Sequence, residues 1–413
     1  MDNLWSEGYT RAFTLLHQAS TKYGMLASLT NETNYRRIWA RDSVICGLAG
    51  ILAEDSLLIE TLGKSLYTLA NAAGPRGEIP SNVRLDNRGK VTNISYGTLS
   101  GRVDSIPWFI IGVCHYINRT GERAFAQQME PVILSGLQLL NCWEFNKRGL
   151  VYVPLGGDWA DEYILHGYVL YDQLLRLWAV GCYGKTSGNE HFIRQAEQLR
   201  ERIRMNYWIS SQNRDREDLY HLPAYKRVLS EKGDLPYWMA SLTPGGYIDR
   251  FDAFANALTF LLGLNTNEQQ ESILAYTESI CEQTAHGLIP AFWEPITPHN
   301  WEWQVLQNNY RYRFRNAPYC YHNGGIWAMV NGWWGLALKE AGKNAAAEVL
   351  LSSLCNLNRQ GEADGQWGFY EYGHALTGEP GGTPRMSWSA AAVVMLREYL
   401  DGKRLYIPEI DHS

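Results

Sequence analysis

The sequence predicts an all-α protein, an (α/α)6 toroid of six helical hairpins with long loops at one end. Apolar residues recur at helical spacing in about twelve segments, whereas the strict alternation typical of strands is scarce. Short and long connections alternate along the chain, so one end of the helical array carries the elaborate loops. An open α-solenoid is the alternative, but it requires a regular repeat period, and none is visible.

Each expected helix begins where the helical pattern starts, often at a Ser, Asp or Asn that can cap the first turn. In chain order, the expected helices begin near Leu4, Arg41, Ser56, Asp104, Arg123, Ile164, Asn189, Asp252, Glu268, Gly325, Asn344 and Ser387. The short links include "AEDS" and "KEAGKN", whereas the long ones are rich in Gly, Pro, Trp and charge. Because no Pro-, Ser- or Gly-rich linker divides the chain, residues 1–413 are expected to form one domain.

The composition excludes several classes of protein. The net charge is −6, and the 37 Lys and Arg residues form no long run, so neither a nucleic-acid partner nor a membrane partner is expected. The seven cysteines are scattered without a CxxC pair, and the N-terminus lacks a signal-peptide pattern, which favours a soluble cytoplasmic protein with free thiols. The 16 Trp and 25 Tyr residues suit a pocket that both stacks on a sugar and hydrogen-bonds it, although large helical proteins also bury aromatic residues.

The segment "VPLGGDWADEYILHGYVLYDQ" places Asp158, Asp161 and Glu162 between a glycine turn and the helix expected near Ile164. A carboxylate on such a long loop is a candidate for acid–base chemistry. Acidic residues before a helix also act as ordinary N-caps, and on this segment alone capping is the simpler interpretation.

The segment "GQWGFYEYGHALTGEPGG" surrounds Glu371 with aromatic residues before a glycine-rich turn. Aromatic neighbours remove water from a carboxyl group and raise its pKa, which suits a general acid or base. The alternative is an exposed loop glutamate.

Two further motifs carry polar and aromatic residues at expected helix starts. In "IWARDSV" the Arg fork and the Asp oxygens can clamp vicinal hydroxyls or form a structural ion pair. In "YCYHNGGIW" the His and Asn side chains can contact ring hydroxyls or form a polar turn. The candidate binding residues of the two motifs are Trp39, Arg41, Asp42, Tyr321, His322 and Asn323.

Templates for other chemistries are missing. The sequence contains no HExxH, no Cys/His metal spacing, no GxSxG, no Walker loop and no dinucleotide-binding motif, so neither a metal nor a cofactor is expected. What remains is a pair of carboxyl groups with aromatic neighbours, which fits hydrolysis of a glycosidic bond.

Several motifs, in the same order, resemble the (α/α)6 glycoside hydrolases of the amylo-glucosidase, trehalase and neutral/alkaline invertase type, most of all the neutral/alkaline invertases. The resemblance covers about residues 33–400. It lies in "IWARDSV", "GEIPSNV", "GRVDSIPWFI", "YIDRFDAFANALTFLLGL", "YHNGGIWAMV", "YEYGHALTGEPGG", "SWSAAA" and the residues His166, Gly167, Leu170 and Gln173.

The resemblance implies an inverting mechanism, with Asp161 as general acid and Glu371 as general base, and with Asp158 as the alternative acid. We expect apolar and acidic neighbours to keep Asp161 protonated, and an inverting pair needs roughly 6.5–9.5 Å between its carboxyl groups. The expected substrate-binding residues are Trp39, Arg41, Asp42, Asp158, Trp159, His166, Tyr321, His322, Asn323 and Trp388.

The predicted function is therefore hydrolysis of a small α-linked disaccharide or glycoside, either of the sucrose type or another α-glucoside. Glu162 and Tyr163 stand where the invertases carry basic residues, which leaves sucrose specificity open. A non-catalytic sugar-binding toroid and an AGE-type sugar epimerase or isomerase are the alternatives. The expected partner is a small carbohydrate, and a homo-oligomer is left open.

Overall fold

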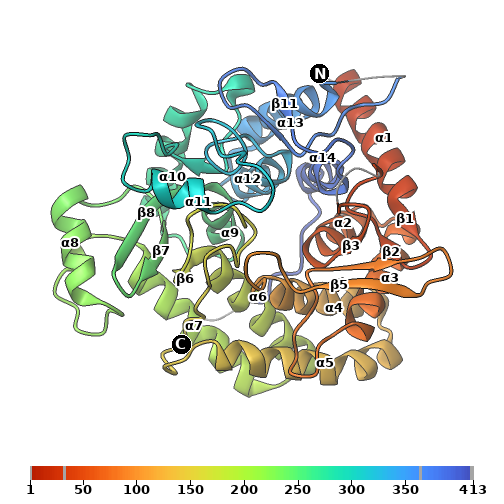
Figure 1. Ribbon diagram of the computed structural model, residues 1–413, viewed down its shortest axis with the longest axis horizontal. Coiled ribbons are helices and arrows are strands. Elements are labelled where there is room, and N and C mark those ends of the chain that lie inside the picture. Colours follow the sequence, from red (N-terminus) through yellow and green to blue (C-terminus); the bar gives the residue numbers. More distant parts are fainter. Residues whose placement is uncertain (1, 31–33, 362–364, 410–413) are drawn as a thin grey trace.

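The computed structural model describes residues 2–30, 34–361 and 365–409. Six helices form a closed ring, because each contacts the next and the last contacts the first (Figure 1). They are α2 (Ala40–Leu52), α4 (Ser105–Thr120), α6 (Leu170–Ser187), α9 (Ala253–Leu261), α12 (Ala328–Glu340) and α14 (Ser387–Leu400). All nine residues of α9 are buried, as expected of a helix that is covered on every side.

Six further helices alternate with the ring helices along the chain. They are α1 (Asp2–Ala19), α3 (Ser56–Asn71), α5 (Arg123–Cys142), α7 (Glu190–Tyr207), α10 (Asn267–Cys281) and α13 (Asn344–Arg359). They bury only one stripe, such as Phe192, Ala196, Leu199 and Ile203 of α7. Helices α3, α5, α7 and α13 pack against the ring helices α2, α4, α6 and α12, and α1 packs against α14.

The helix expected near Ile164 begins instead at Leu170, which corrects the prediction by six residues. Gly167 interrupts the pattern: its φ is +86°, and a Cβ there would lie 2.5 Å from the Leu242 carbonyl oxygen. The other eleven expected starts lie within three residues of an observed one. Two short helices inside long connections, α8 (Leu222–Lys232) and α11 (Trp303–Asn308), were not expected.

Four small antiparallel sheets also occur within the described residues, and the sequence pattern did not predict them. Several lead directly into ring helices, since β3 precedes α2, β6 precedes α6 and β8 precedes α9. The loop-bearing end of the ring is therefore stiffened by strand pairing. The strands are β1 (Ser20–Thr21), β2 (Gly24–Met25), β3 (Ile38–Trp39), β4 (Asn82–Leu85), β5 (Val91–Ser95), β6 (Tyr168–Val169), β7 (Met239–Thr243), β8 (Gly246–Asp252), β9 (Phe292–Trp293), β10 (Tyr372–Gly373) and β11 (Pro380–Gly381).

Within the part of the chain that the structure describes, no helix combines the length and the apolar character needed to cross a membrane.

Candidate active site

The predicted carboxyl groups come from loops at the end of the ring where the ring helices begin. Each outer helix returns the chain, so consecutive ring helices run in the same direction and open towards the same side. Trp39 and Asp42 mark the start of α2, and Trp388 marks the start of α14. The loops before α6 and α14 add Asp161 and Glu371 to this end.

Glu371 is buried, with only 1% of its surface exposed, so it is not an exposed loop glutamate. The Tyr35 hydroxyl donates to its Oε1 at 2.6 Å, and the Thr383 backbone N–H donates to its Oε2 at 3.1 Å. Gly382 is required beside it, because φ is +77° and a Cβ there would lie 2.3 Å from Oε2. Burial raises the pKa of Glu371, and the Arg315 charge and the Tyr35 hydrogen bond oppose that rise only in part.

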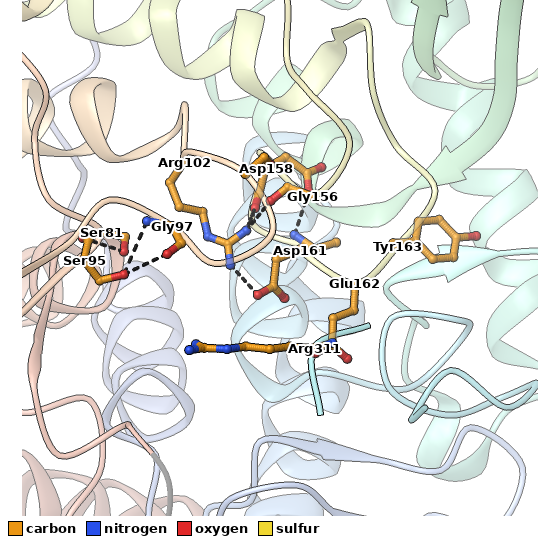
Figure 2. A network of polar contacts seen from close by, with 12 residues as sticks. Ser81, Ser95, Gly97, Arg102, Gly156, Asp158, Asp161, Glu162, Tyr163 and Arg311 are labelled. Atoms are coloured by element: carbon orange, nitrogen blue, oxygen red, sulfur yellow. Dashed lines mark hydrogen bonds and ion pairs between the residues drawn. The ribbon is translucent and has the colours of Figure 1, made fainter. Parts of the chain in front are cut away.

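Asp161 is held by Arg102, as Figure 2 shows. One guanidinium nitrogen pairs with the Asp161 carboxylate, while the other donates to the carbonyl oxygens of Gly156 at 2.6 Å and Asp158 at 3.0 Å. The side chain of Asp161 is 21% exposed, whereas that of Arg102 is buried. Because α6 begins only at Leu170, nine residues after Asp161, helix capping is not the role of this aspartate.

The ionisation of Asp161 differs from the expectation that its neighbours keep it protonated. Burial alone would raise its pKa, but the charges of Arg102 and Arg315 and the hydrogen bond from Arg102 outweigh burial and lower the pKa. The sequence expectation failed because Arg102 lies 59 residues away along the chain. In the substrate-free protein Asp161 is therefore a carboxylate.

Asp158 faces a different environment. Its Oδ1 accepts a hydrogen bond from the Ala160 N–H at 2.8 Å, and its buried Oδ2 has no partner among the described residues. Burial, followed by the charges of Asp252 and Asp104, raises its pKa. Asp158 thus closes the turn and faces the buried acids at the starts of other ring helices.

Arg315 connects the two loops. Its guanidinium lies 3.8 Å from the ring centroid of Tyr321, bonds the Tyr321 hydroxyl at 2.6 Å and pairs with Glu162 at 3.2 Å. Its charge favours the ionised form of both Asp161 and Glu371, and the negative charge of Asp161 in turn raises the pKa of Glu371. Tyr321 in turn packs on Tyr372, the neighbour of Glu371, with the ring centroids 5.5 Å apart, so Arg315 and Tyr321 link the two candidate loops.

An aromatic wall adjoins these carboxyls. The ring centroids of Trp159 and His322 are 5.4 Å apart, those of His322 and Trp327 are 5.0 Å apart, and those of Trp327 and Trp388 are 5.8 Å apart. The buried Nε1 of Trp159, Nε1 of Trp388 and Nδ1 of His322 have no hydrogen-bond partner in the described structure. Burial lowers the pKa of His322 well below its ordinary value, so its ring is neutral. Unpaired polar atoms in a buried wall indicate a place for a polar ligand.

The "IWARDSV" motif contributes a second group of contacts. Arg41 pairs with Asp104 at 2.7 Å, not with its neighbour Asp42, and its guanidinium lies 5.3 Å from the Trp388 ring centroid. The buried Oδ1 of Asp42 has no partner among the described residues, and burial raises the Asp42 pKa to about 6. Trp39 stacks on Tyr35 with the ring centroids 5.7 Å apart, which links this motif to Glu371.

Two predicted binding residues lie in the loop framework. The carboxamide of Asn323 is occupied by backbone groups, accepting from Ile296 N–H at 2.6 Å and donating to Ile296 at 2.8 Å and Asn316 at 3.0 Å. His166 lies in the turn before α6, where its Nδ1 is 3.0 Å from the Ile164 carbonyl oxygen. In this structure both residues shape the loops around the site.

Sequence reasoning missed Tyr35, Arg102 and Arg315 as site residues. Arg102 lies inside the "GRVDSIPWFI" motif, which was the available signal for it. Nothing in "YRYRFRNAP" separates Arg315 from Arg311 and Arg313, because only the folded loop brings the Arg315 guanidinium to Glu162 and Tyr321. In the described part of the chain, no cluster of three or more His, Cys, Asp or Glu side chains is arranged to hold a metal.

Comparison with known proteins bears on this site. A sequence model of the family described as alkaline and neutral invertase matches residues 12–401. The chain belongs to this family. It is 25% identical over 276 residues to neutral/alkaline invertase 1, mitochondrial, of Oryza sativa subsp. japonica, covering 60% of this chain and 43% of the relative. It is 23% identical over 351 residues to alkaline/neutral invertase E, chloroplastic, of Arabidopsis thaliana, covering 73% of this chain and 56% of the relative.

This invertase-family chain spans about half the length of the curated relatives it matches. Among solved structures it is similar to a mannosylglycerate hydrolase from Thermus thermophilus in complex with Tris, with a TM-score of 0.66 and 14% identity over 94% of this chain and 99% of the other. It is also similar to a bacterial glucoamylase complexed with acarbose, with a TM-score of 0.64 and 16% identity over 98% of this chain and 56% of the other. These likenesses show that the family member shares the fold of (α/α)6 glycosidases.

Proposed function

We propose that this invertase-family chain is an inverting glycoside hydrolase, built as one catalytic domain on an (α/α)6 toroid, that cleaves a small α-linked disaccharide or glycoside. One arrangement supports the proposal: Arg315 pairs with Glu162, the neighbour of Asp161, and bonds Tyr321, whose ring lies 5.5 Å from that of Tyr372, the neighbour of Glu371. A pair of carboxyl groups flanking the scissile bond is the machinery that glycoside hydrolysis requires.

Asp161 acts as general acid on the glycosidic oxygen, and Glu371 acts as general base on the attacking water. The productive form has its proton on Asp161 and none on Glu371, which is the less populated arrangement in the free protein because Arg102 favours ionised Asp161. A sugar that draws Arg102 away from Asp161, or shields the two groups from each other, raises the pKa of Asp161 and populates the productive form.

The sugar ring binds against the aromatic wall. Its hydroxyl groups partner the buried atoms that lack hydrogen bonds in the described structure, namely Trp159 Nε1, Trp388 Nε1, His322 Nδ1 and Asp42 Oδ1. Trp39, already stacked on Tyr35, offers an apolar face. These contacts supply orientation, while the two carboxyl groups supply the chemistry.

Glu162 replaces the basic residue that follows the acid in the resembling invertases, and its partner is Arg315 from another loop. We therefore leave sucrose and other α-glucosides as alternatives for the substrate. We also propose a reducing compartment, such as the cytoplasm, since all seven cysteines are free thiols.

The test is incubation with sucrose, trehalose, maltose, isomaltose, glucosylglycerol and glycosylglycerates, followed by NMR of the anomeric protons. Cleavage of one α-glycoside with first release of the β-anomer is the expected result. Release of the α-anomer would contradict inversion. Interconversion of a free monosaccharide would indicate an epimerase, and binding without cleavage would indicate a sugar-binding protein.

A further inference from the structure

A group of cations without ion-pair partners lines a groove that also includes Ile38, the residue before Trp39. A groove of about 1040 Å³ is lined by Lys22, Arg36, Arg37 and Arg84, together with polar residues of the β4–β5 hairpin. None of these four forms an ion pair with any residue that the structure describes. The chain as a whole has 43 acidic and 37 basic residues, so a groove with four unpaired cations departs from its average charge.

The register of the β3–β4–β5 sheet shows where this groove lies relative to the site. Trp39 pairs with Asn82, and Arg84 pairs with Asn93. Since alternate residues of a strand point to opposite faces, Asn82 and Arg84 share the face opposite to that of the buried Val83. The paired residues Arg84 and Asn93 are therefore two positions, or about 7 Å, along the sheet from the paired residues Trp39 and Asn82.

Arg37 is fixed on the same face. Its Nη1 donates to the side-chain oxygens of Asn82 at 3.0 Å and Asn93 at 2.8 Å. Both partners are neutral amides, so the contacts orient the guanidinium without cancelling its charge. In the sequence, Arg37 lies between Tyr35 and Trp39. Because Tyr35 bonds Glu371, this segment connects the groove to the candidate active site.

Arg311, from the loop that also carries Arg315, adds a further cation. Its backbone N–H donates to Glu162 Oε1 at 3.3 Å, next to Asp161, and Figure 2 shows its side chain extending past Asp161 in the direction of Ser81 and Ser95. Arg84 pairs in register with Asn93, which accepts from Arg37, and the pKa of Arg37 is lowered by burial and then by the charges of Arg84 and Arg311.

The one acid lining the groove does not balance this charge. Asp86 directs its Oδ1 to the backbone N–H groups of Arg88 at 2.8 Å and Lys90 at 2.9 Å, which closes the hairpin turn. The planar fork of a guanidinium group matches the oxygens of a carboxylate or a phosphate and can bind either through paired hydrogen bonds.

We propose that the substrate carries an acidic group, a carboxylate or a phosphate ester, on the part released next to Asp161, and that Arg37, Arg84 and Arg311 bind that group. The inference rests on the proposed function, because the general acid protonates the leaving group and so that part of the substrate faces Asp161. The neutral sugar ring occupies the aromatic wall, and the acidic end occupies the cationic mouth.

The test uses pairs of substrates that differ only in charge: glucosylglycerol against glucosylglycerate for the carboxylate, and sucrose against sucrose phosphorylated on its fructose for the phosphate. We expect kcat/KM at least about tenfold higher for the acidic member of one pair, since a charge-assisted contact is worth about that factor or more. The pair that shows the preference identifies the source of the acidic group.

The Arg37→Gln, Arg84→Gln double variant should lower kcat/KM on the acidic member about ten- to a hundredfold and on the neutral member far less. Arg88→Gln, in the same hairpin but outside the groove, makes the same kind of charge change and should preserve the preference. Equal rates on both members in the wild type, or equal losses in the double variant, would overturn the inference while leaving glycosidase activity intact.

A binding measurement separates the two proposals if no glycoside is cleaved. Calorimetric titration of the Glu371→Gln protein with D-glycerate and with inorganic phosphate should show binding of one of them, lost after Arg37→Gln and Arg84→Gln and kept after Arg88→Gln. Absence of binding for both probes would reject the anion site directly.

Discussion

The loop around Asp161 and the loop around Glu371 hold carboxyl groups in opposite ways. The side chain of Asp161 is partly exposed and is paired with the buried cation Arg102. Glu371 is almost fully buried, and its hydrogen bonds come from the neutral donors Tyr35 and Thr383. The pKa of Asp161 is therefore lowered, whereas that of Glu371 is raised.

The comparison shows that burial alone does not decide ionisation. Burial raises the pKa of both Asp161 and Glu371, and the charges around them separate the two: Arg102 lowers the pKa of Asp161, whereas the charge of Asp161 adds to the rise at Glu371. In the free protein this separation places the shared proton on Glu371, so substrate binding must shift it towards Asp161 before Asp161 can act as the acid. The following changes test which partner creates the difference.

Removing either carboxyl should have the largest effect. Asp161→Asn and Glu371→Gln should each lower kcat by about a thousandfold, because each removes a proton-transfer group. Unfolding measured by circular dichroism should show that both variants remain folded. Asp158→Asn, which keeps the contact to Ala160, should lose less activity. If Asp158→Asn loses more activity than Asp161→Asn, Asp158 is the general acid.

Removing the Arg102 charge should reduce the difference in pKa between Asp161 and Glu371. Arg102→Met should lower kcat about ten- to a hundredfold, because the 156–161 turn loses its three contacts. The pKa of Asp161 should rise, so the acid limb of the kcat/KM profile, set by the lower pKa of the pair, should move to higher pH. Arg102→Lys keeps the charge and should shift the limb less. If the acid limb of the profile is unchanged in Arg102→Met, ionisation of Asp161 does not determine that limb.

Tyr35→Phe should act on the other loop and by a smaller factor. The Tyr35 hydroxyl lowers the pKa of Glu371, so its removal should raise that pKa and move the alkaline limb to higher pH, with about a tenfold loss of kcat. The pH profile of kcat/KM measures the shift. If the acid limb shifts instead, the lower of the two pKa values belongs to Glu371, which contradicts the order of pKa values given above.

Asp252 offers a control for both loops, because it is a buried acid with a raised pKa and no proposed role in turnover. Its Oδ1 caps α9 through the N–H groups of Phe254 and Ala255, and burial raises its pKa to about 7. Since the unfolded pKa is about 3.9, Asp252 should cost stability progressively as pH rises from about 4 to 7, at about 1.4 kcal/mol per unit.

Asp252→Asn keeps a good cap and should flatten this fall in the free energy of unfolding, measured by urea denaturation between pH 4 and 8. Turnover should change by less than about threefold, the smallest effect of the series. A large loss of turnover would place Asp252 in the catalytic machinery.

The sequence alone determined the helical ring and the two candidate carboxyls. Helical periodicity is local, and a helix buried on all sides, such as α9, reads as apolar throughout. Glu371 was found because its aromatic neighbours are adjacent in the chain. The small sheets were missed because strands of two to seven residues, such as β3 and β8, give too little alternation to detect.

Only the tertiary structure decided how the site is charged. Arg102 reaches Asp161 across 59 residues, and Tyr35 reaches Glu371 across 336. Electrostatic interactions depend on distance in space and on burial, neither of which sequence separation reports. The sequence therefore predicted which acids are the catalytic candidates, while the folded loops determined which of them is ionised.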